Sequence, residues 1–237
     1  MIDEQGNIKY DGFRKANIIS ELKARIVLKA REKMYNAFLD SVHPSKEDKI
    51  LDSGVSPAKG IPNQKILTNN YFERRYPWKN KITATSIEDA SFLEQEYPGL
   101  KFVQCEPYKT NFADREFDAV FCNAVVEHAG TREQQKMFVH EYCRVGKKVF
   151  FTTPNRWFPF ESHSALPFIH WLPPKIFRAV LRVLGKGALA DESILNLLDA
   201  KDFKNLFPSS MNIKVINIKT LGLSSNICVY GEWITNG

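Results

Sequence analysis

One short segment constrains the fold of this chain more than any other. Residues 49–54 read Lys-Ile-Leu-Asp-Ser-Gly, an apolar run that leads into Asp52, with Gly54 two residues later. A strand followed by a glycine turn is typical of an open α/β sheet, where the turn approaches a nucleotide. A carboxylate at this position would repel a pyrophosphate and attract an ammonium or sulfonium group. The segment therefore favours a positively charged nucleotide ligand over a dinucleotide.

Strands and helices alternate along the chain. Apolar runs predict strands at 49–55, 81–87, 101–104, 117–123 and 148–153. Helical spacing and the capping box of Thr131 and Gln134 predict helices near 19–42, 67–76, 88–97 and 131–146. Two more strands are predicted at the end of the chain, over 213–219 and 226–234. Such alternation gives a doubly wound, mostly parallel sheet through right-handed crossovers.

Polar residues stand at or just past the ends of five predicted strands. They are Asp52, Glu88, Glu106, Asn123 and Asn155. In a parallel sheet the carboxyl ends of the strands share one edge, and ligands bind in the crevice beyond it. We therefore expect these five side chains to converge on one binding crevice.

In the order and spacing of these motifs, the chain resembles a class I S-adenosylmethionine-dependent methyltransferase. Residues 117–120 (FDAV) and 125–128 (VVEH) match the FD-x-V and V-x-EH motifs of one bacterial group, and the similarity covers about residues 31–175. The resemblance implies an α/β fold with a Rossmann-like, doubly wound, mostly parallel seven-stranded sheet and an antiparallel C-terminal strand pair. It also implies an enzyme that uses S-adenosylmethionine as its cofactor.

The resemblance places the methionine end of the cofactor at the first strand. Asp52 would hold the ammonium group and Gly54 would allow close backbone approach, although an acid here can also simply serve a turn. The family usually has more glycine in this loop, whereas this chain has Val-Ser-Pro at 55–57, so we expect the loop to bind differently. Ser56 and Asn70 are the further contacts predicted at this end.

The ribose and adenine are assigned to the next three strands. The family normally has an acid at the end of the second strand, but Ser86 occupies that place here. Glu88 lies two residues on and shares a face with Ser86 if the strand continues, so Glu88 is predicted to hold the ribose. An acid favoured by a helix N-terminus is the alternative interpretation. Glu106 is predicted at the adenine amino group, and Asn123 on the opposite side of the cofactor.

Two histidines are candidates for the general base that a hydroxyl acceptor requires. His128 ends the V-x-EH motif, and His163 lies on the variable loop after the fifth strand. The alternative for His128 is a positioning role through hydrogen bonds, because relatives with different acceptors share the motif. The spacing of the histidines and carboxylates does not predict a metal site.

The segment that follows the fifth strand is rich in aromatic residues and prolines. We expect residues 156–210 to form an insertion or lid that covers the acceptor, within a single methyltransferase domain at 19–237 after an irregular segment at 1–18. A basic amphipathic helix is predicted after Pro174. The predicted acceptor contacts are Asn155, Arg156, Trp157 and Glu161. The alternative for this segment is a hydrophobic plug that packs on the sheet.

Composition limits the remaining functions. The net charge of +6 comes from basic residues spread along the chain, so no nucleic-acid partner is expected. Four scattered cysteines indicate neither a disulfide framework nor a zinc site. The N-terminus has no apolar core of a signal peptide, and a cytoplasmic location is expected.

The predicted reaction is O-methylation of a small-molecule or glycan acceptor, such as a cell-envelope sugar in polysaccharide biosynthesis. The glycan follows from the resemblance alone, and the aromatic loop and basic helix would also suit a lipid-linked acceptor at a membrane surface. A non-catalytic binding protein of the same fold is one alternative. An NAD-dependent oxidoreductase is disfavoured because the chain has no G-x-G-x-x-G motif. The sequence does not predict an oligomeric state.

Overall fold

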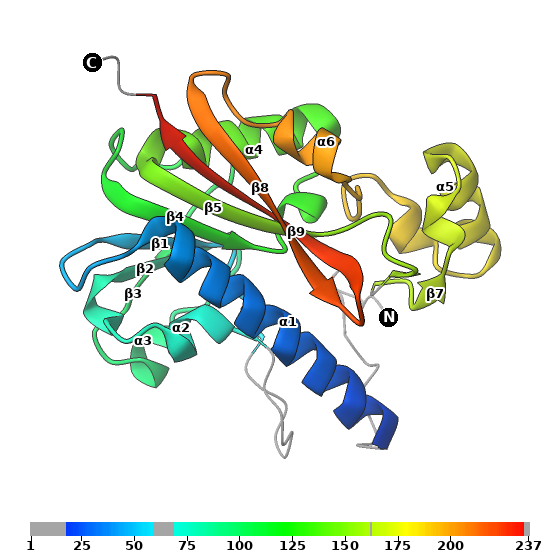
Figure 1. Ribbon diagram of the computed structural model, residues 1–237, viewed down its shortest axis with the longest axis horizontal. Coiled ribbons are helices and arrows are strands. Elements are labelled where there is room, and N and C mark those ends of the chain that lie inside the picture. Colours follow the sequence, from blue (N-terminus) through cyan, green and yellow to red (C-terminus); the bar gives the residue numbers. More distant parts are fainter. Residues whose placement is uncertain (1–17, 59–68, 162, 235–237) are drawn as a thin grey trace.

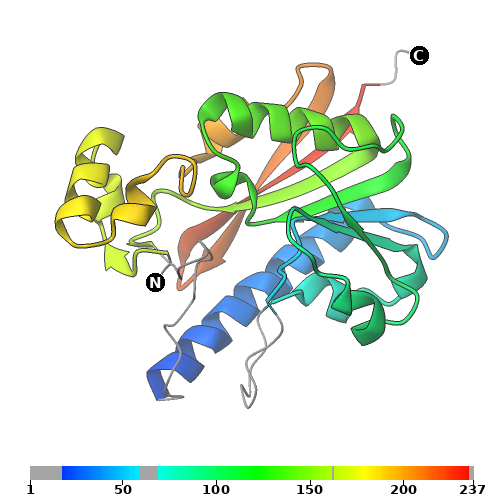
Figure 2. The same ribbon diagram turned by 180° about the vertical axis from the view of Figure 1, so that it is seen from behind.

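The computed structural model describes residues 18–58, 69–161 and 163–234. A twisted sheet runs through the centre of the protein, and helices cover both of its faces (Figures 1 and 2). The helices are α1 (Ile18–Val42), α2 (Tyr71–Arg75), α3 (Phe92–Glu96), α4 (Arg132–Val145), α5 (Pro174–Val183) and α6 (Ala200–Lys204). The strands of the sheet are β1 (Ile50–Ser53), β2 (Ile82–Ser86), β3 (Lys101–Gln104), β4 (Phe117–Asn123), β5 (Gly146–Pro154), β8 (Met211–Thr220) and β9 (Leu223–Trp233).

The seven strands lie in the order β3-β2-β1-β4-β5-β9-β8. The first five are parallel, whereas β9 runs antiparallel to both β5 and β8. The predicted fold is therefore confirmed, including the antiparallel C-terminal pair at one edge. The strand order reverses between β1 and β4, and a switch point of this kind is where open α/β sheets bind ligands.

Alternation along β1 directs its side chains to both faces of the sheet. Ile50 packs on the side of α1, α2 and α3, whereas Leu51 packs on the side of α4 and α6. On the first side, Phe38 of α1 contacts the rings of Phe72, Phe121 and Phe150 edge-on, at centroid distances of 5.3–5.8 Å. This aromatic cluster fixes α1 and α2 against the sheet.

The helix α4 begins as the sequence predicts. The Thr131 side chain accepts from the backbone N–H of Gln134, and the Gln134 side chain accepts from the backbone N–H of Thr131. Two otherwise unpaired donors of the first turn are thereby satisfied. The cap fixes the direction of the chain just after the V-x-EH motif.

A small lobe follows β5 and stands beside the main sheet (Figure 2). It contains the two-stranded pair β6 (Phe160–Glu161) and β7 (Leu166–Pro167), together with α5. Phe177 and Leu181 of α5 pack on Leu195 and Leu197 in a core of their own. The segment thus packs largely on itself, and the predicted amphipathic helix is confirmed. No helix in the described residues is both long and apolar enough to cross a membrane.

Two predicted helices begin later than expected. The helix predicted near 67–76 is α2, which begins at Tyr71, and residues 67 and 68 lie outside the described part of the chain. The helix predicted from Glu88 is α3, which begins at Phe92, because residues 87–91 form a turn in which Asp89 accepts from the backbone N–H of Ser91. The predicted irregular segment at 1–18 likewise falls almost wholly outside the described residues.

Candidate active site

Two buried carboxyl groups lie together beside the glycine turn. Asp52 of β1 and Glu73 of α2 are only 5% and 1% exposed. Burial, followed by the charge of Glu73 and a hydrogen bond with it, raises the pKa of Asp52. Burial also raises the pKa of Glu73, to about 7, against the opposing influence of Arg31 and Lys79. The pair therefore retains a proton close to neutral pH, and a cation that approached it would favour release of that proton.

The turn after β1 requires glycine. Gly54 has a φ of +77°, and a Cβ at this position would lie 2.4 Å from a methyl carbon of Val125. The backbone N–H of Ser56 donates to Asn70 Oδ1 at 2.9 Å, and Asn70 Nδ2 donates to the Ser56 carbonyl at 3.1 Å. Asn70 thus returns to the loop as expected and joins its two ends. Residues 59–68 between them lie outside the described part of the chain.

The end of β2 differs from the prediction. The strand ends at Ser86, so the argument that Glu88 shares its face is wrong. Ser86 Oγ instead accepts from the backbone N–H of Glu88 at 3.2 Å, and the Glu88 side chain is exposed.

A cavity of about 390 Å³ opens beyond the ends of β2 and β3. Glu106 lines it together with apolar side chains (Ile87, Val103 and Phe112) and polar ones (Gln104, Lys109 and Asn111). A slot with apolar side chains and a carboxylate suits a purine ring that carries an amino group. A larger cavity of about 990 Å³ lies between α6 and the ends of β8 and β9, away from the predicted site residues.

The structure brings the two candidate histidines into contact. His128 Nε2 lies 3.1 Å from His163 Nε2, although 35 residues separate them in the sequence. His128 Nδ1 lies 2.7 Å from the carbonyl oxygen of Ile194, and His163 Nδ1 lies 2.6 Å from Glu161 Oε1. A carbonyl or carboxylate oxygen only accepts, so both Nδ1 atoms must carry hydrogen. The lone pairs of two neutral rings would therefore point at each other through Nε2.

Glu161 holds His163 in place. It is 4% exposed, and its two oxygens accept from the backbone N–H groups of His163 and Ser164 as well as from the His163 ring. Although burial opposes ionisation, these hydrogen bonds lower the pKa of Glu161 to about 2. Burial by itself would lower the pKa of His163, but the hydrogen bond and charge of Glu161 outweigh it and raise that pKa.

Glu127 lies beside the two histidines. It is 0% exposed, and its Oε2 accepts from Thr153 Oγ1 at 3.0 Å. Its Oε1 is buried with no hydrogen-bond partner among the described residues. Glu127, His128 and His163 each have an atom that can bind a metal ion, and these three atoms lie within 4.8 Å of one another. The sequence places Glu127 beside His128 but gives no sign that His163 joins them.

The remaining predicted residues have partners within the protein. Asn123 Oδ1 accepts from Thr152 Oγ1 at 2.6 Å, and Asn155 Nδ2 donates to the Ser224 carbonyl at 3.0 Å. Arg156 Nη2 donates to the Leu172 carbonyl at 2.8 Å, while its Nε is buried without a partner in the described residues. The Asn155 contact joins the end of β5 to β9, whereas the Arg156 contact holds the part of the lobe that leads into α5.

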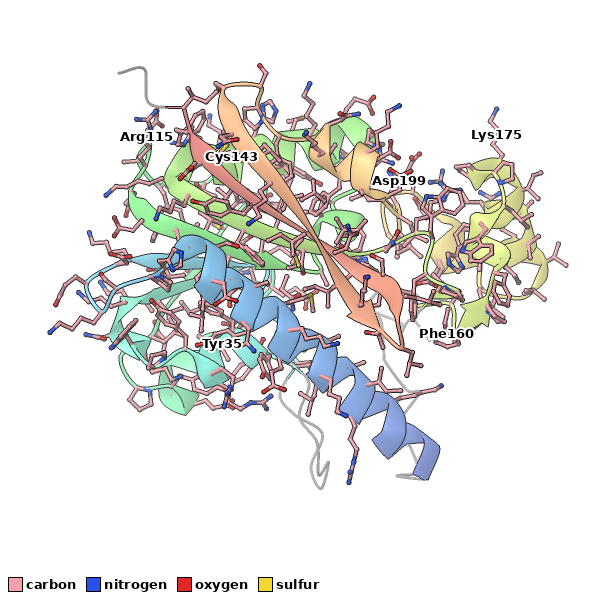
Figure 3. All side chains as sticks on the ribbon, in the orientation of Figure 1. Tyr35, Arg115, Cys143, Phe160, Lys175 and Asp199 are labelled. Atoms are coloured by element: carbon pink, nitrogen blue, oxygen red, sulfur yellow. The ribbon has the colours of Figure 1, made fainter. Side chains whose placement is uncertain are left out.

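Trp157 lies where the lobe meets the main sheet. It is 51% exposed, and its indole N–H points to Asp199 Oδ2 at 3.4 Å. Asp199 lies between the lobe and the sheet, whereas Lys175 points away from the body of the protein (Figure 3). Trp157 is therefore the predicted acceptor contact with the most surface left for a ligand.

Residues 69–149 match a protein-family model described as a methyltransferase domain. The matched segment runs from the start of α2 into β5 and includes Glu73, Glu106 and His128. These residues of the chain are thus similar to part of a methyltransferase domain. The match agrees with the predicted methyltransferase, and the sheet order agrees with the predicted class I fold. No curated protein matches the chain in sequence.

Solved structures share the fold of this methyltransferase at low sequence identity. The magnesium protoporphyrin IX methyltransferase of Synechocystis PCC 6803, with bound S-adenosylhomocysteine, is 11% identical and has a TM-score of 0.52, with 92% of this chain and 88% of that one covered. The N-methyltransferase NodS of Bradyrhizobium japonicum WM9, in complex with S-adenosylhomocysteine, is 9% identical with a TM-score of 0.53, covering 86% and 87%. A putative zinc-dependent alcohol dehydrogenase of Rhodobacter sphaeroides is 9% identical with a TM-score of 0.55, covering 84% and 88%. At these identities the similarity shows the fold alone.

The residues of the candidate site fit S-adenosylmethionine, the predicted cofactor. A buried carboxyl pair suits the ammonium group, the Gly54 turn leaves backbone free of side chain, and the slot at Glu106 suits adenine.

Proposed function

We propose that this methyltransferase transfers the methyl group of S-adenosylmethionine to a hydroxyl oxygen of a small-molecule or glycan acceptor. The observation that carries the proposal is the contact of His128 with His163, whose ring also donates a hydrogen bond to Glu161. An oxygen nucleophile must lose its proton as it attacks, and two imidazole nitrogens with available lone pairs can receive it.

The proposed cofactor contacts follow the strand ends. Asp52 holds the ammonium group, with Glu73 as the partner that sets its protonation. Gly54 and Ser56 form the turn around the methionine, which Asn70 supports from α2. The adenine lies in the slot at Glu106, while Asn123 faces the cofactor from β4. Glu88 stays a prediction for the ribose, from the turn after β2 and not from the strand.

The residues around the acceptor have distinct proposed roles. His128 and His163 are the catalytic pair, because their Nε2 atoms face each other with both Nδ1 hydrogens already used. Glu161 is a positioning residue, since its oxygens already accept from three donors. Trp157 offers the exposed ring against which a sugar or other flat group packs. Catalysis otherwise comes from alignment of acceptor and methyl group and from exclusion of water.

The lobe is the proposed cover of the acceptor, as part of the lid predicted at 156–210. Its helix α5 leaves Ile176, Val183 and Leu184 exposed at 51%, 87% and 49%. Exposed apolar side chains among Lys175 and Arg182 suit a lipid-linked acceptor at an anionic membrane surface. The cytoplasmic location and a role in polysaccharide biosynthesis stay predictions.

The proposal is tested first by calorimetry with S-adenosylmethionine and S-adenosylhomocysteine. Binding to the intact protein and much weaker binding to Asp52→Asn are expected. Transfer of a labelled methyl group is then assayed on hydroxyl acceptors and on matched amines. His128→Gln should keep cofactor binding and lose transfer to hydroxyls, with His140→Gln on the exposed side of α4 as the matched control. Transfer to amines alone, or equal rates in the two histidine variants, would overturn the proposal.

A further inference from the structure

The cluster of Glu127, His128 and His163 has the features of a metal-binding site. We propose that it binds one divalent transition metal ion, with Zn²⁺ as the ion that best fits two imidazoles and a carboxylate. The inference deepens the proposed function, because the ion would lie where the acceptor hydroxyl is to be activated. Binding of the ion itself does not depend on that function.

The geometry of the histidine pair carries the inference. With Zn–N distances of about 2.0–2.1 Å, two nitrogen ligands of a tetrahedral ion lie about 3.3 Å apart. The two Nε2 atoms lie 3.1 Å apart. Because both Nδ1 atoms must carry hydrogen, a cation between the Nε2 atoms is what removes the repulsion of their lone pairs. That cation is either a single proton or a metal ion.

The outer contacts of both rings match those of metal-bound histidines. Histidines that bind a metal nearly always donate their other N–H to a carboxylate or a backbone carbonyl, which fixes the tautomer and the ring. His163 donates to Glu161 at 2.6 Å, and His128 donates to the carbonyl of Ile194 at 2.7 Å. Both rings are therefore oriented before any ion arrives.

Glu127 favours a metal ion over a proton. A buried carboxylate oxygen without a partner is costly unless a cation compensates it. Glu127 Oε1 is such an atom, and one carboxylate oxygen of Glu127 lies within 4.8 Å of a ring nitrogen of each histidine. A shared proton satisfies the two nitrogens only, whereas an ion also satisfies the carboxylate after a small side-chain movement. Three protein ligands leave a fourth position open, which is the arrangement of catalytic zinc sites.

An ion in this site would change the role of the histidines. Their Nε2 lone pairs would be used as ligands, so the ion would lower the pKa of a hydroxyl that binds at the open position. The acceptor would then lose its proton to solvent or to a group of its own. The same residues thus serve the same reaction in a different way.

The test is a titration of untagged, chelator-treated full-length protein with Co²⁺, followed by visible absorption, and with Zn²⁺, followed by calorimetry. One equivalent should bind, with the absorption bands of a four- or five-coordinate Co²⁺ site. His163→Gln and His128→Gln should each weaken binding by more than about 100-fold, a loss at least as large as that seen when an outer-shell partner is removed. His140→Gln is the matched control and should bind as the intact protein does.

Binding of S-adenosylhomocysteine to each variant shows that it is folded. Absence of saturable binding to the intact protein, or equal affinity in His163→Gln, would overturn the metal site. If the metal does not bind but methyl transfer to hydroxyls still requires His128, the proposed function stands and only the proposal of a metal site fails. If the metal binds and no hydroxyl is methylated, the proposed function fails alone.

Discussion

Replacement of Glu73 by glutamine should make the stability of the protein less sensitive to a rise in pH from 4.5 to about 7. Glu73 is 1% exposed, and burial raises its pKa from the ordinary value of 4.5 to about 7. The folded protein therefore holds this proton more tightly than the unfolded chain does. The resulting stabilisation is fully present below pH 4.5 and is lost as the pH rises through 7. Glutamine keeps the shape of the side chain and has no proton to lose.

The magnitude follows from the pKa values. A tenfold change in proton affinity corresponds to about 1.4 kcal/mol, so a rise from 4.5 to about 7 corresponds to about 3 kcal/mol of unfolding free energy. The raised pKa of Asp52 acts in the same direction. Relative to the intact protein, Glu73→Gln should therefore gain about 3 kcal/mol between pH 4.5 and pH 8.

Urea unfolding at several pH values measures this gain, because only the difference between the two proteins is compared at each pH. Glu47→Gln is the control, since the Glu47 side chain is 73% exposed in its ion pair with Lys81 and should show no such trend. Asp52→Asn should change in the same direction as Glu73→Gln. A difference between Glu73→Gln and the intact protein that stays constant from pH 5 to pH 8 would refute a raised pKa at Glu73.

Three further predictions concern the turn, the cap and the core. Gly54→Ala should lose about 1–3 kcal/mol of stability and most of its affinity for S-adenosylhomocysteine, because Gly54 has a φ of +77° and the added Cβ would meet Val125. Gly187→Ala is the control in the same calorimetric assay, since a Cβ at Gly187 meets nothing within 4 Å. Thr131→Ala should lose about 1 kcal/mol in urea unfolding as the capping box is broken, and an unchanged midpoint would contradict that role. Phe38→Ala should lose about 3–5 kcal/mol, since its ring is fully buried, and a loss below about 1 kcal/mol would show that the aromatic cluster does not hold α1.

Local patterns were enough to predict most of the fold. The strands at 101–104 and 117–123 and the cap at Thr131 depend on neighbouring residues, and the structure has them where they were expected. The strand predicted to reach residue 87 ends at Ser86, because the length of β2 is set by pairing with β3, which the residues around Ser86 do not report. Asx-type hydrogen bonding of Asp89 then delays the helix.

The site was only partly predictable for a related reason. His128 and His163 were separate alternatives in the sequence, and only the path of the lobe brings their rings together. Glu73 stands in the short sequence Tyr-Phe-Glu-Arg-Arg, where an acid among arginines is typical of a solvated helix. Its burial against Asp52 depends on how α2 docks on the sheet. Contacts of this kind are tertiary and leave no local pattern.

The position of α1 has a consequence for how the chain folds during synthesis. This helix lies against β5, β8 and β9, and Lys33 donates to the carbonyl of Lys219 at 2.6 Å across 186 residues. The ribosome therefore makes α1 well before β8 and β9. Until β8 and β9 emerge, the apolar side of α1 that carries Met34 and Phe38 has only part of its docking surface. Closure of this long-range contact should be a late, slow step of folding, which leaves this apolar side exposed to aggregation until then.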